Sequence, residues 1–308
     1  MTIGRDGLTR QGFLGAALAA AVGGGAAAQG GTAPALHRRA IPGTGETLPV
    51  IGLGTWRGFD VGETPAERAP LRGVVATLLA GGGRVIDSSP MYGRAEGVTG
   101  DLVAEAGASD TAFLATKVWT SGREAGIAQM QRSLRLLRTE RLDLMQIHNL
   151  LDWRTHLPVL REWKAAGRIR HLGISHYTES AYDAVEAVLR AERLDVLQIN
   201  YALDDRAAEE RLLPLAAERG VAVLVNRPFG GGGLLRRLAG RPLPGYAADL
   251  GSGSWAELLL KFAVSHPAVT CAIPGTADPG HMAANLRAGI GPLPDEALRR
   301  RMAADMTP

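Results

Sequence analysis

The chain contains three short apolar runs between residues 84 and 148: RVIDSS (84–89), AFLATKV (112–118) and LDLMQIH (142–148). Each has the length and composition of a strand that is buried on both faces, and helix-length segments separate them. Five more such runs complete a set of eight: PVIGLG (49–54), HLGIS (171–175), VLQIN (196–200), VAVLVNR (221–227) and AVTCAIP (268–274). Buried strands that alternate with helices predict a parallel sheet, and eight such units predict an α/β fold with a single (β/α)8 TIM barrel.

The segments between the strands carry helix start signals. These signals are Thr64 with Pro65 and Glu67, Ser254 with Glu257, and Asp278 before Pro279. An open, doubly wound sheet is the alternative architecture. The barrel is favoured because GLGTWRG (52–58) lacks the last spacing of a dinucleotide-binding GxGxxG turn, and because no GxxxxGK phosphate loop occurs.

The composition excludes several classes of protein. With 308 residues, 46% of them apolar and 21% charged, the chain is typical of a folded globular protein. Its net charge of +3 is spread along the sequence, so we expect no nucleic-acid partner. A single cysteine, Cys271, excludes an internal disulfide and a thiolate metal site, and we expect no metal. Its apolar neighbours predict a buried thiol.

Residues 1–36 form a separate leader in this interpretation, and the barrel occupies residues 47–308. Arg5 and Arg10 precede the apolar run FLGAALAAAV, and small residues at 26–28 offer a cleavage site, which is typical of an export signal. The run is too short for a stable membrane span. TRQGFL (9–14) resembles a twin-arginine signal, except that Gln11 replaces the second arginine. We therefore expect an exported, periplasmic protein; the alternative is a cytoplasmic protein with a disordered extension.

Four ionisable residues are expected at one rim of the barrel. Asp87, Lys117 and His148 lie at the carboxyl ends of consecutive strands, where barrel enzymes hold their active sites, and Tyr92 follows Asp87 by five residues. Lys117 is one of only three lysines, and it lies in an apolar run. A buried ammonium needs an anionic partner, and Asp87 on the neighbouring strand can provide it.

This set of residues suits proton donation to a carbonyl oxygen. The Lys117 charge is expected to lower the pKa of Tyr92, which then acts as general acid, while His148 donates a hydrogen bond to the same oxygen. None of the four is a source of electrons, so a hydride must come from a cofactor. A lyase that uses Lys117 as a Schiff-base amine is an alternative.

With these motifs the chain resembles the aldo-keto reductase family. The resemblance rests on GLGTW (52–56), the spacing of the four ionisable residues, GISHYT (173–178), LQINY (197–201) and IPGTADPGHMAANL (273–286). It implies that Asp87, Tyr92, Lys117 and His148 are catalytic. It also implies a set of cofactor-binding residues: Thr55, Trp56, Asp87, Ser175, His176, Gln198, Asn226, Arg227, Gly275, Thr276, His281 and Asn285.

Four positions depart from the family pattern. His176 replaces an asparagine beside the carboxamide-binding serine, and Asn226 replaces the aromatic that stacks on nicotinamide. Gly275 and His281 replace the lysine and arginine that hold the 2′-phosphate. NADP is the expected cofactor, and NAD is the alternative because these two cations are missing.

The resemblance implies a monomeric, NAD(P)H-dependent enzyme that reduces a small-molecule aldehyde or ketone. Its substrate pocket would be lined by Trp56, Trp119, Asn149 and Leu150. A nucleotide-binding sensor or scaffold without turnover remains the alternative within the same fold.

Overall fold

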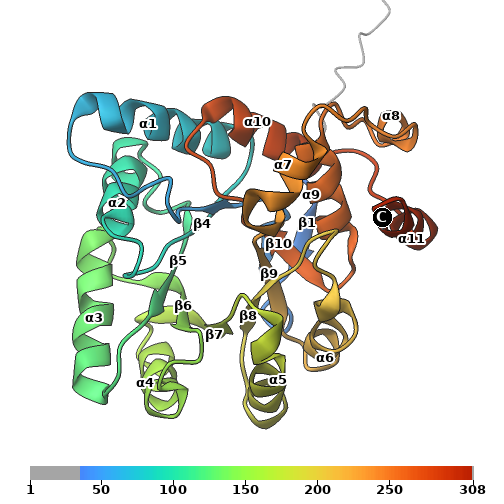
Figure 1. The fold of residues 1–308 in the computed structure, drawn as a ribbon. Coiled ribbons are helices and arrows are strands. Elements are labelled where there is room, and N and C mark those ends of the chain that lie inside the picture. Colours follow the sequence, from blue (N-terminus) through green and yellow to red (C-terminus); the bar gives the residue numbers. More distant parts are fainter. Residues whose placement is uncertain (1–34, 307–308) are drawn as a thin grey trace, which may run out of the picture. The chain divides into compact units, whose positions relative to one another are not determined.

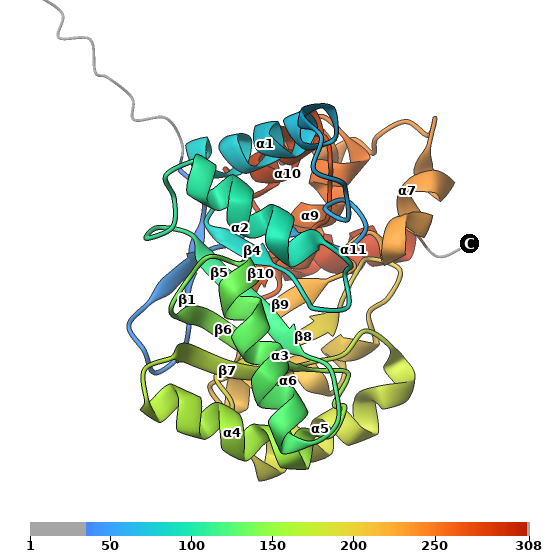
Figure 2. The same ribbon diagram turned by 90° about the vertical axis from the view of Figure 1, so that its left-hand side faces the viewer.

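A computed structural model describes residues 35–306 of the chain, and these contain an eight-stranded parallel barrel (Figures 1 and 2). Its strands follow the chain order: β3 (Leu53–Gly54), β4 (Val85–Asp87), β5 (Phe113–Val118), β6 (Leu142–His148), β7 (Ile169–Ser175), β8 (Val196–Asn200), β9 (Ala222–Asn226) and β10 (Val269–Ala272). Parallel bridges from Ile51 to Ala272 and from Gly54 to Gly275 join the two edges of the sheet. The predicted barrel is therefore confirmed.

Helices surround the strands on the outside (Figure 1). The longer ones are α1 (Pro65–Ala80), α2 (Ala95–Glu105), α3 (Arg123–Leu136), α4 (Trp153–Ala165), α5 (Tyr182–Ala191), α6 (Leu212–Glu218), α9 (Trp255–Ser265), α10 (Pro279–Ala288) and α11 (Glu296–Asp305). Shorter turns are η1 (Glu179–Ala181), η2 (Ala207–Glu209), η3 (Gly230–Gly232), α7 (Gly233–Leu238) and α8 (Tyr246–Asp249). The predicted start signals are confirmed, because Thr64, Ser254 and Asp278 each accept a backbone N–H of the first helical turn. Across residues 35–306, none of the helices combines the length and apolar character that crossing a bilayer requires.

A small hairpin precedes the barrel. Strands β1 (Arg38–Ala40) and β2 (Thr47–Pro49) pair in antiparallel fashion. The sequence predicted one strand over 49–54, whereas Pro49 ends the hairpin and β3 begins only at Leu53. Ile41 and Leu48 pack into the same buried cluster as Phe113 near the start of β5, so the hairpin covers the amino-terminal end of the barrel. The opposite rim, at the carboxyl ends of the strands, is left for a site.

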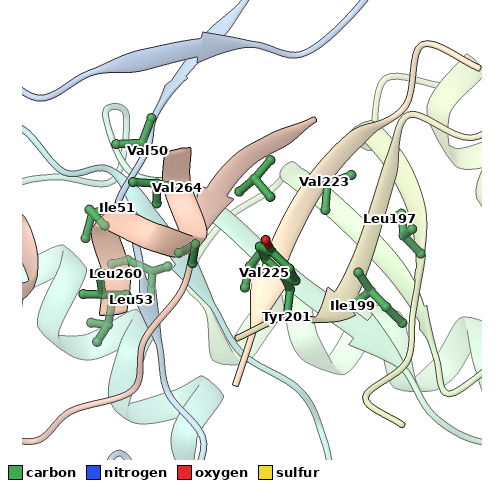
Figure 3. Packing of buried hydrophobic residues seen from close by; sticks show 14 of the residues in the cluster. Val50, Ile51, Leu53, Leu197, Ile199, Tyr201, Val223, Val225, Leu260 and Val264 are labelled. Carbon is green, nitrogen blue, oxygen red and sulfur yellow. The ribbon is translucent and has the colours of Figure 1, made fainter. Parts of the chain in front are cut away.

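The core has two layers that follow from the alternation of side chains along a strand. The inner layer fills the barrel and includes Val85, Ala115 and Leu144. The outer layer lies between strands and helices. Figure 3 shows part of it, with Leu197 and Val223 from the strands and Leu260 and Val264 from α9. Cys271 belongs to the inner layer and is a buried free thiol, as predicted.

Candidate active site

The alternation of the strands directs polar side chains into the carboxyl-terminal end of the barrel. Each of the inner-layer residues Val85, Ala115 and Leu144 is followed two positions later by a residue on the same face. Those residues are Asp87, Lys117 and Gln146, and His148 follows Gln146 by two more positions. The parallel register places Lys117 directly across from Gln146. The predicted catalytic residues of three strands therefore meet inside one rim.

Asp87 and Lys117 form a buried ion pair. Lys117 Nζ lies 2.6 Å from Asp87 Oδ2, and the two side chains are 0% and 3% exposed. The ammonium also donates to the Ser88 carbonyl at 2.8 Å. Burial alone would lower the pKa of Lys117, but the negative charge and the hydrogen bond of Asp87 raise it above its usual value. Lys117 is therefore a fixed positive charge and a poor Schiff-base nucleophile, which argues against the lyase alternative.

Tyr92 lies beside this positive charge. Its ring centroid is 5.2 Å from Lys117 Nζ, and the ammonium also interacts with the phenol as a hydrogen-bond partner. Burial raises the pKa of Tyr92, the Lys117 charge opposes that rise, and Asp87 adds to it. The sequence correctly predicted that Lys117 acts to lower the pKa of Tyr92. The pKa of Tyr92 is nevertheless above its usual value in the free protein, because burial has the larger effect. Tyr92 is thus a protonated acid next to a charge that stabilises its conjugate base.

His148 completes the group as a neutral hydrogen-bonding side chain. Its Nδ1 lies 3.0 Å from Ser89 Oγ, and its ring meets the Tyr92 ring edge-on, with 5.9 Å between the centroids. Burial, followed by the Lys117 charge, lowers the pKa of His148 to about 2. The imidazole therefore carries one proton at neutral pH. When Ser89 donates to Nδ1, that proton lies on Nε2, where it can be donated to a carbonyl oxygen.

The second oxygen of Asp87 is held by two amides. Gln146 Nε2 donates to Asp87 Oδ1 at 3.0 Å, and Gln198 Nε2 donates to the same oxygen at 2.9 Å and to Gln146 Oε1 at 3.2 Å. Sequence reasoning missed Gln146, because it lies in an apolar run. Its position two residues before His148, on the same strand face, was the signal that could have identified it.

A cavity of about 1220 Å³ opens above these residues. Most of the predicted site residues line it: Thr55, Trp56, Asp87, Tyr92, His148, Asn149, Ser175, His176, Gln198, Asn226, Arg227, Gly275, Thr276, His281 and Asn285. Three predicted residues do not. Lys117 is fully buried, Leu150 packs against the core, and Trp119 is 41% exposed with its ring 6.5 Å from that of His148.

The cavity has unused polar groups that suit a carboxamide. Ser175 Oγ, Asn149 Oδ1 and Asn226 Oδ1 are buried and have no hydrogen-bond partner among residues 35–306. Buried polar groups are normally paired, so these three atoms favour a polar ligand. Gln198 uses its amide N–H groups on Asp87 and Gln146, which leaves its oxygen as an acceptor on the cavity side. The amide oxygens can accept from a carboxamide NH2 group and the Ser175 hydroxyl can donate to its oxygen, so these groups fit the nicotinamide end of a dinucleotide.

Asn226, which replaces the aromatic residue of the family pattern, is held in place by a hydrogen bond. Its Nδ2 donates to the His176 carbonyl at 2.9 Å, so the amide plane is fixed between β9 and the loop after β7. This contact joins the two residues at which the chain departs from the pattern beside the nicotinamide site. Asn226 and His176 thus form one local unit.

Several lining residues were not predicted from the sequence. Arg57, Met91 and Tyr177 lie at the mouth, next to predicted residues, and a long segment after β9 contributes Phe229, Leu235 and Trp255. That segment contains the glycine-rich run 230–233. Among the described residues, no group of histidine, cysteine or carboxylate side chains could hold a metal ion.

Comparisons with known proteins identify the family and support the fold. The sequence profile described as "Aldo/keto reductase family" matches residues 50–305. Methylglyoxal reductase YeaE of Escherichia coli (strain K12) is 30% identical over 247 residues, which cover 78% of this chain and 84% of that protein. Aldo-keto reductase YhdN of Bacillus subtilis (strain 168) is 30% identical over 201 residues, 60% of each chain. A crystal structure of an aldo/keto reductase from Klebsiella pneumoniae in complex with NADP and acetate has 27% identity and a TM-score of 0.69, and the match covers 84% of this chain and 91% of that one.

Proposed function

Because this chain belongs to the aldo/keto reductase family, we propose that it reduces an aldehyde or ketone to an alcohol with NADPH, and that Tyr92 is the proton donor. The observation that carries the proposal is the contact between the Tyr92 phenol and the buried Lys117–Asp87 pair at the floor of a dinucleotide-sized cavity. NADPH supplies the hydride that reduces the carbonyl carbon.

Residues of the chain bind the carbonyl oxygen and transfer the proton. His148 and Tyr92 both line the cavity and their ring centroids are 5.9 Å apart, so we assign the carbonyl oxygen to the space that their polar groups share. A carbonyl oxygen held there accepts a hydrogen bond from each, and the Tyr92 proton moves to it as negative charge develops. The Lys117 ammonium stabilises the resulting tyrosinate, and Asp87 keeps that ammonium in place.

The cofactor is held by the polar groups already described. We assign the carboxamide to Ser175, Asn149 and the oxygen of Gln198, since these are the unpaired or free groups nearest the catalytic floor. The adenosine end is assigned to Thr276, His281 and Asn285, which line the far part of the same cavity. The Klebsiella structure contains NADP, which supports the choice of cofactor.

The mouth of the cavity favours a substrate with an apolar part. Within residues 35–306, the large apolar side chains that remain exposed are Trp56, Met91, Trp119 and Tyr177. Three of them line the cavity, and Trp119 lies near His148. Exposed apolar groups that gather at one cavity mark a binding surface. Small dicarbonyls belong in the first substrate panel, because the E. coli relative is named a methylglyoxal reductase.

A direct assay tests the proposal. NADPH absorbance is followed with and without a panel of aldehydes and ketones that includes methylglyoxal and aromatic aldehydes. We expect carbonyl-dependent oxidation of NADPH by the wild-type protein. Quenching of NADPH fluorescence without any carbonyl-dependent oxidation would instead support the sensor or scaffold alternative and would refute the reductase.

We propose separately that residues 1–36 direct export. These residues lie outside the part of the chain that the structure describes, so the support is the sequence alone: the basic start, the apolar run and the small residues at 26–28. Amino-terminal sequencing of the protein from its native cells tests this proposal. A mature chain that begins near residue 29 agrees with it, and an intact Met1 in a cytosolic fraction contradicts it.

A further inference from the structure

Tyr92 lies on the short connection between β4 and α2, and backbone hydrogen bonds hold it there. β4 ends at Asp87 and α2 begins at Ala95. The Tyr92 N–H donates to the Ser89 carbonyl at 3.0 Å, and the Tyr92 carbonyl accepts from the Ala95 N–H at 3.2 Å. The phenol is thus tied through one turn to the first residue of the helix. Its position therefore depends on where α2 begins.

Glu96, the second residue of α2, is a buried carboxylate that the proposed reaction does not use. It is 2% exposed. Burial raises its pKa, and the opposing influences include a hydrogen bond from Thr116 and the charge of Lys117. Within the described residues Glu96 has no ion pair, because Lys117 pairs with Asp87 instead. A buried carboxylate without an ion pair costs folding free energy, so its presence at this position needs an explanation.

The hydrogen-bond partner of Glu96 is the strand residue next to Lys117. Thr116 Oγ1 donates to Glu96 Oε1 at 2.6 Å, and both side chains are buried. Alternation along β5 directs Lys117 into the barrel and Thr116 outward, toward the helices. Among residues 35–306, no other side-chain hydrogen bond joins α2 to a strand of the barrel, since Asp101 and Glu105 bond to arginines of α1. The bond therefore fixes the first turn of α2 to β5.

We propose that Glu96 is a positioning residue for the reaction: through Thr116 it fixes the start of α2, and with it the Tyr92 phenol, beside Lys117. The inference rests on the proposed function, since it takes Tyr92 to be the proton donor. Two supports then act on the pair of Tyr92 and Lys117. Asp87 holds Lys117 from inside the barrel, and Glu96 holds the segment that carries Tyr92 from the helix layer. The ring centroid of Tyr92 is 5.2 Å from Lys117 Nζ, and the interaction weakens as that distance grows.

Thr116→Val tests the proposal with little change of shape, because it removes only the hydroxyl that bonds Glu96. A displacement of about 1 Å at a reacting group can cost on the order of 10²-fold in rate, so we expect single-turnover carbonyl reduction to fall by about 10- to 100-fold. The dissociation constant for NADPH should stay the same, since neither Thr116 nor Glu96 lines the cavity. Stopped-flow absorbance and fluorescence titration measure the two quantities.

The titration of Tyr92 gives a readout that a purely structural role would not change. With Lys117 less closely placed, the pKa of Tyr92 should rise, because the lysine charge lowers it. The rising limb of the pH–rate profile for alcohol oxidation should then move to higher pH in Thr116→Val. The same pKa is measured without turnover by NMR of ¹³C-labelled tyrosine, with the signal assigned by its loss in Tyr92→Phe.

Variants of Glu96 separate the hydrogen bond from the charge. Glu96→Gln keeps an oxygen that can accept from Thr116, so we expect a rate within about threefold of the wild type. Glu96→Leu removes the acceptor and should lose as much rate as Thr116→Val. The double variant Glu96→Leu/Thr116→Val should lose no more than either single variant, because the two side chains act through one bond.

Asp101→Ala is the matched control on the same helix. Asp101 accepts from Arg68 at 2.5 Å and pairs with Arg138 at 2.6 Å, away from the first turn of α2. Its loss should lower the melting temperature and leave the reduction rate and the pH profile as in the wild type. Circular dichroism and melting curves establish that every variant folds.

Three results would overturn the proposal. The first is a folded Thr116→Val protein with the wild-type rate, pH profile and Tyr92 titration. The second is an equal loss of rate in Asp101→Ala, which would mean that any loosening of α2 slows the reaction. The third is a loss in Glu96→Gln as large as in Glu96→Leu. Failure of the proposed function looks different: the wild-type protein would oxidise NADPH with no carbonyl compound, while NMR would still show whether Thr116→Val raises the pKa of Tyr92.

Discussion

Lys117 Nζ lies 2.6 Å from Asp87 Oδ2, and the pair is sealed between the barrel interior and the Tyr92 ring. Because an ammonium in this position would otherwise lose its hydration without compensation, the carboxylate keeps it charged. The positive charge then lowers the pKa of the neighbouring Tyr92 phenol against the effect of burial, and it helps to keep His148 neutral. The ion pair is thus a fixed electrostatic support for a proton donor at the cavity floor.

Tyr92→Phe should separate chemistry from cofactor binding. The substitution removes only the hydroxyl, so we expect carbonyl reduction to fall by about 10²- to 10⁴-fold, the range for loss of a general acid. The dissociation constant for NADPH should stay nearly the same, since the phenol oxygen is assigned to the substrate. Stopped-flow turnover and fluorescence titration measure the two quantities. Retention of wild-type turnover would rule out Tyr92 as the proton donor.

Lys117→Met should change the pH dependence as well as the rate. Lys117 lowers the pKa of Tyr92 against the effect of burial, so its removal should raise that pKa further. In alcohol oxidation the reactive form is tyrosinate, and the rising limb of the pH–rate profile should move to higher pH. Leaving Asp87 buried without its partner should also cost about 3–5 kcal/mol of unfolding free energy.

Lys164→Met is the control for the Lys117 variant. Lys164 and Asp195 form an ion pair of the same length, 2.6 Å, outside the cavity and with the lysine 40% exposed. This variant should lose little stability and keep the wild-type pH profile, because exposed pairs contribute little. An unshifted profile in a folded Lys117→Met protein would refute the electrostatic role.

The barrel could be predicted from the sequence because its strands are buried on both faces and therefore appear as apolar runs. The hairpin could not, since Arg38–Ala40 is mostly exposed and carries no apolar pattern. The same contrast applies to the site. Asp87, Lys117 and His148 were found as polar residues at the ends of apolar strands, whereas Gln146, in the middle of such a run, was overlooked.

Residues beyond the strand ends were harder to place, because a turn decides where their side chains point. Asn149 and Leu150 both follow His148 and both have left-handed angles, with φ values of 54° and 56°. Asn149 lines the cavity, and Leu150 packs against the core. Arg57 and Arg227 have the same kind of backbone. The number of residues between a position and the end of its strand does not tell which way a left-handed turn directs the side chain. Leu150 was predicted to line the substrate pocket because it lies two residues after His148, and it does not line the cavity.

Gln146→Leu tests whether the amide positions Asp87. The carboxylate would keep the Gln198 donor on Oδ1 but lose the Gln146 donor, and a hydrogen bond to a charged group contributes about 1.5–3 kcal/mol of stability. We expect a lower turnover together with a shifted pH profile, since Lys117 is held through Asp87. Gln129→Leu, which removes a glutamine bonded to the Trp119 backbone, is the control. A folded Gln146→Leu protein that keeps the wild-type pH profile would show that Gln146 does not position Asp87 for the reaction.

Gly275→Lys should increase the preference for NADPH over NADH. The new ammonium would lie at the adenosine part of the cavity, beside Thr276, and would attract a 2′-phosphate. A Cβ at this position lies 3.2 Å from the Gly54 carbonyl, so the backbone must shift slightly. Gly275→Ala isolates that steric effect. The ratio of the dissociation constant for NADH to that for NADPH should be higher in Gly275→Lys than in Gly275→Ala. Equal ratios in the two variants would place the 2′-phosphate elsewhere.

His266 should make stability depend on pH. Burial, then the charges of Arg299 and Arg39, lower its pKa to about 4, and Glu209 only partly opposes them. As the pH falls from about 6.5 to about 4, the unfolded chain gains a proton at this residue that the folded protein does not. The free energy of unfolding should therefore decrease over this interval.

His266→Asn retains an acceptor for the Ala268 N–H and removes the titration. Urea unfolding at several pH values should show a shallower decrease in this variant, by at most about 1.4 kcal/mol per pH unit. Parallel curves for the wild-type protein and His266→Asn would show that His266 does not contribute to the acid sensitivity.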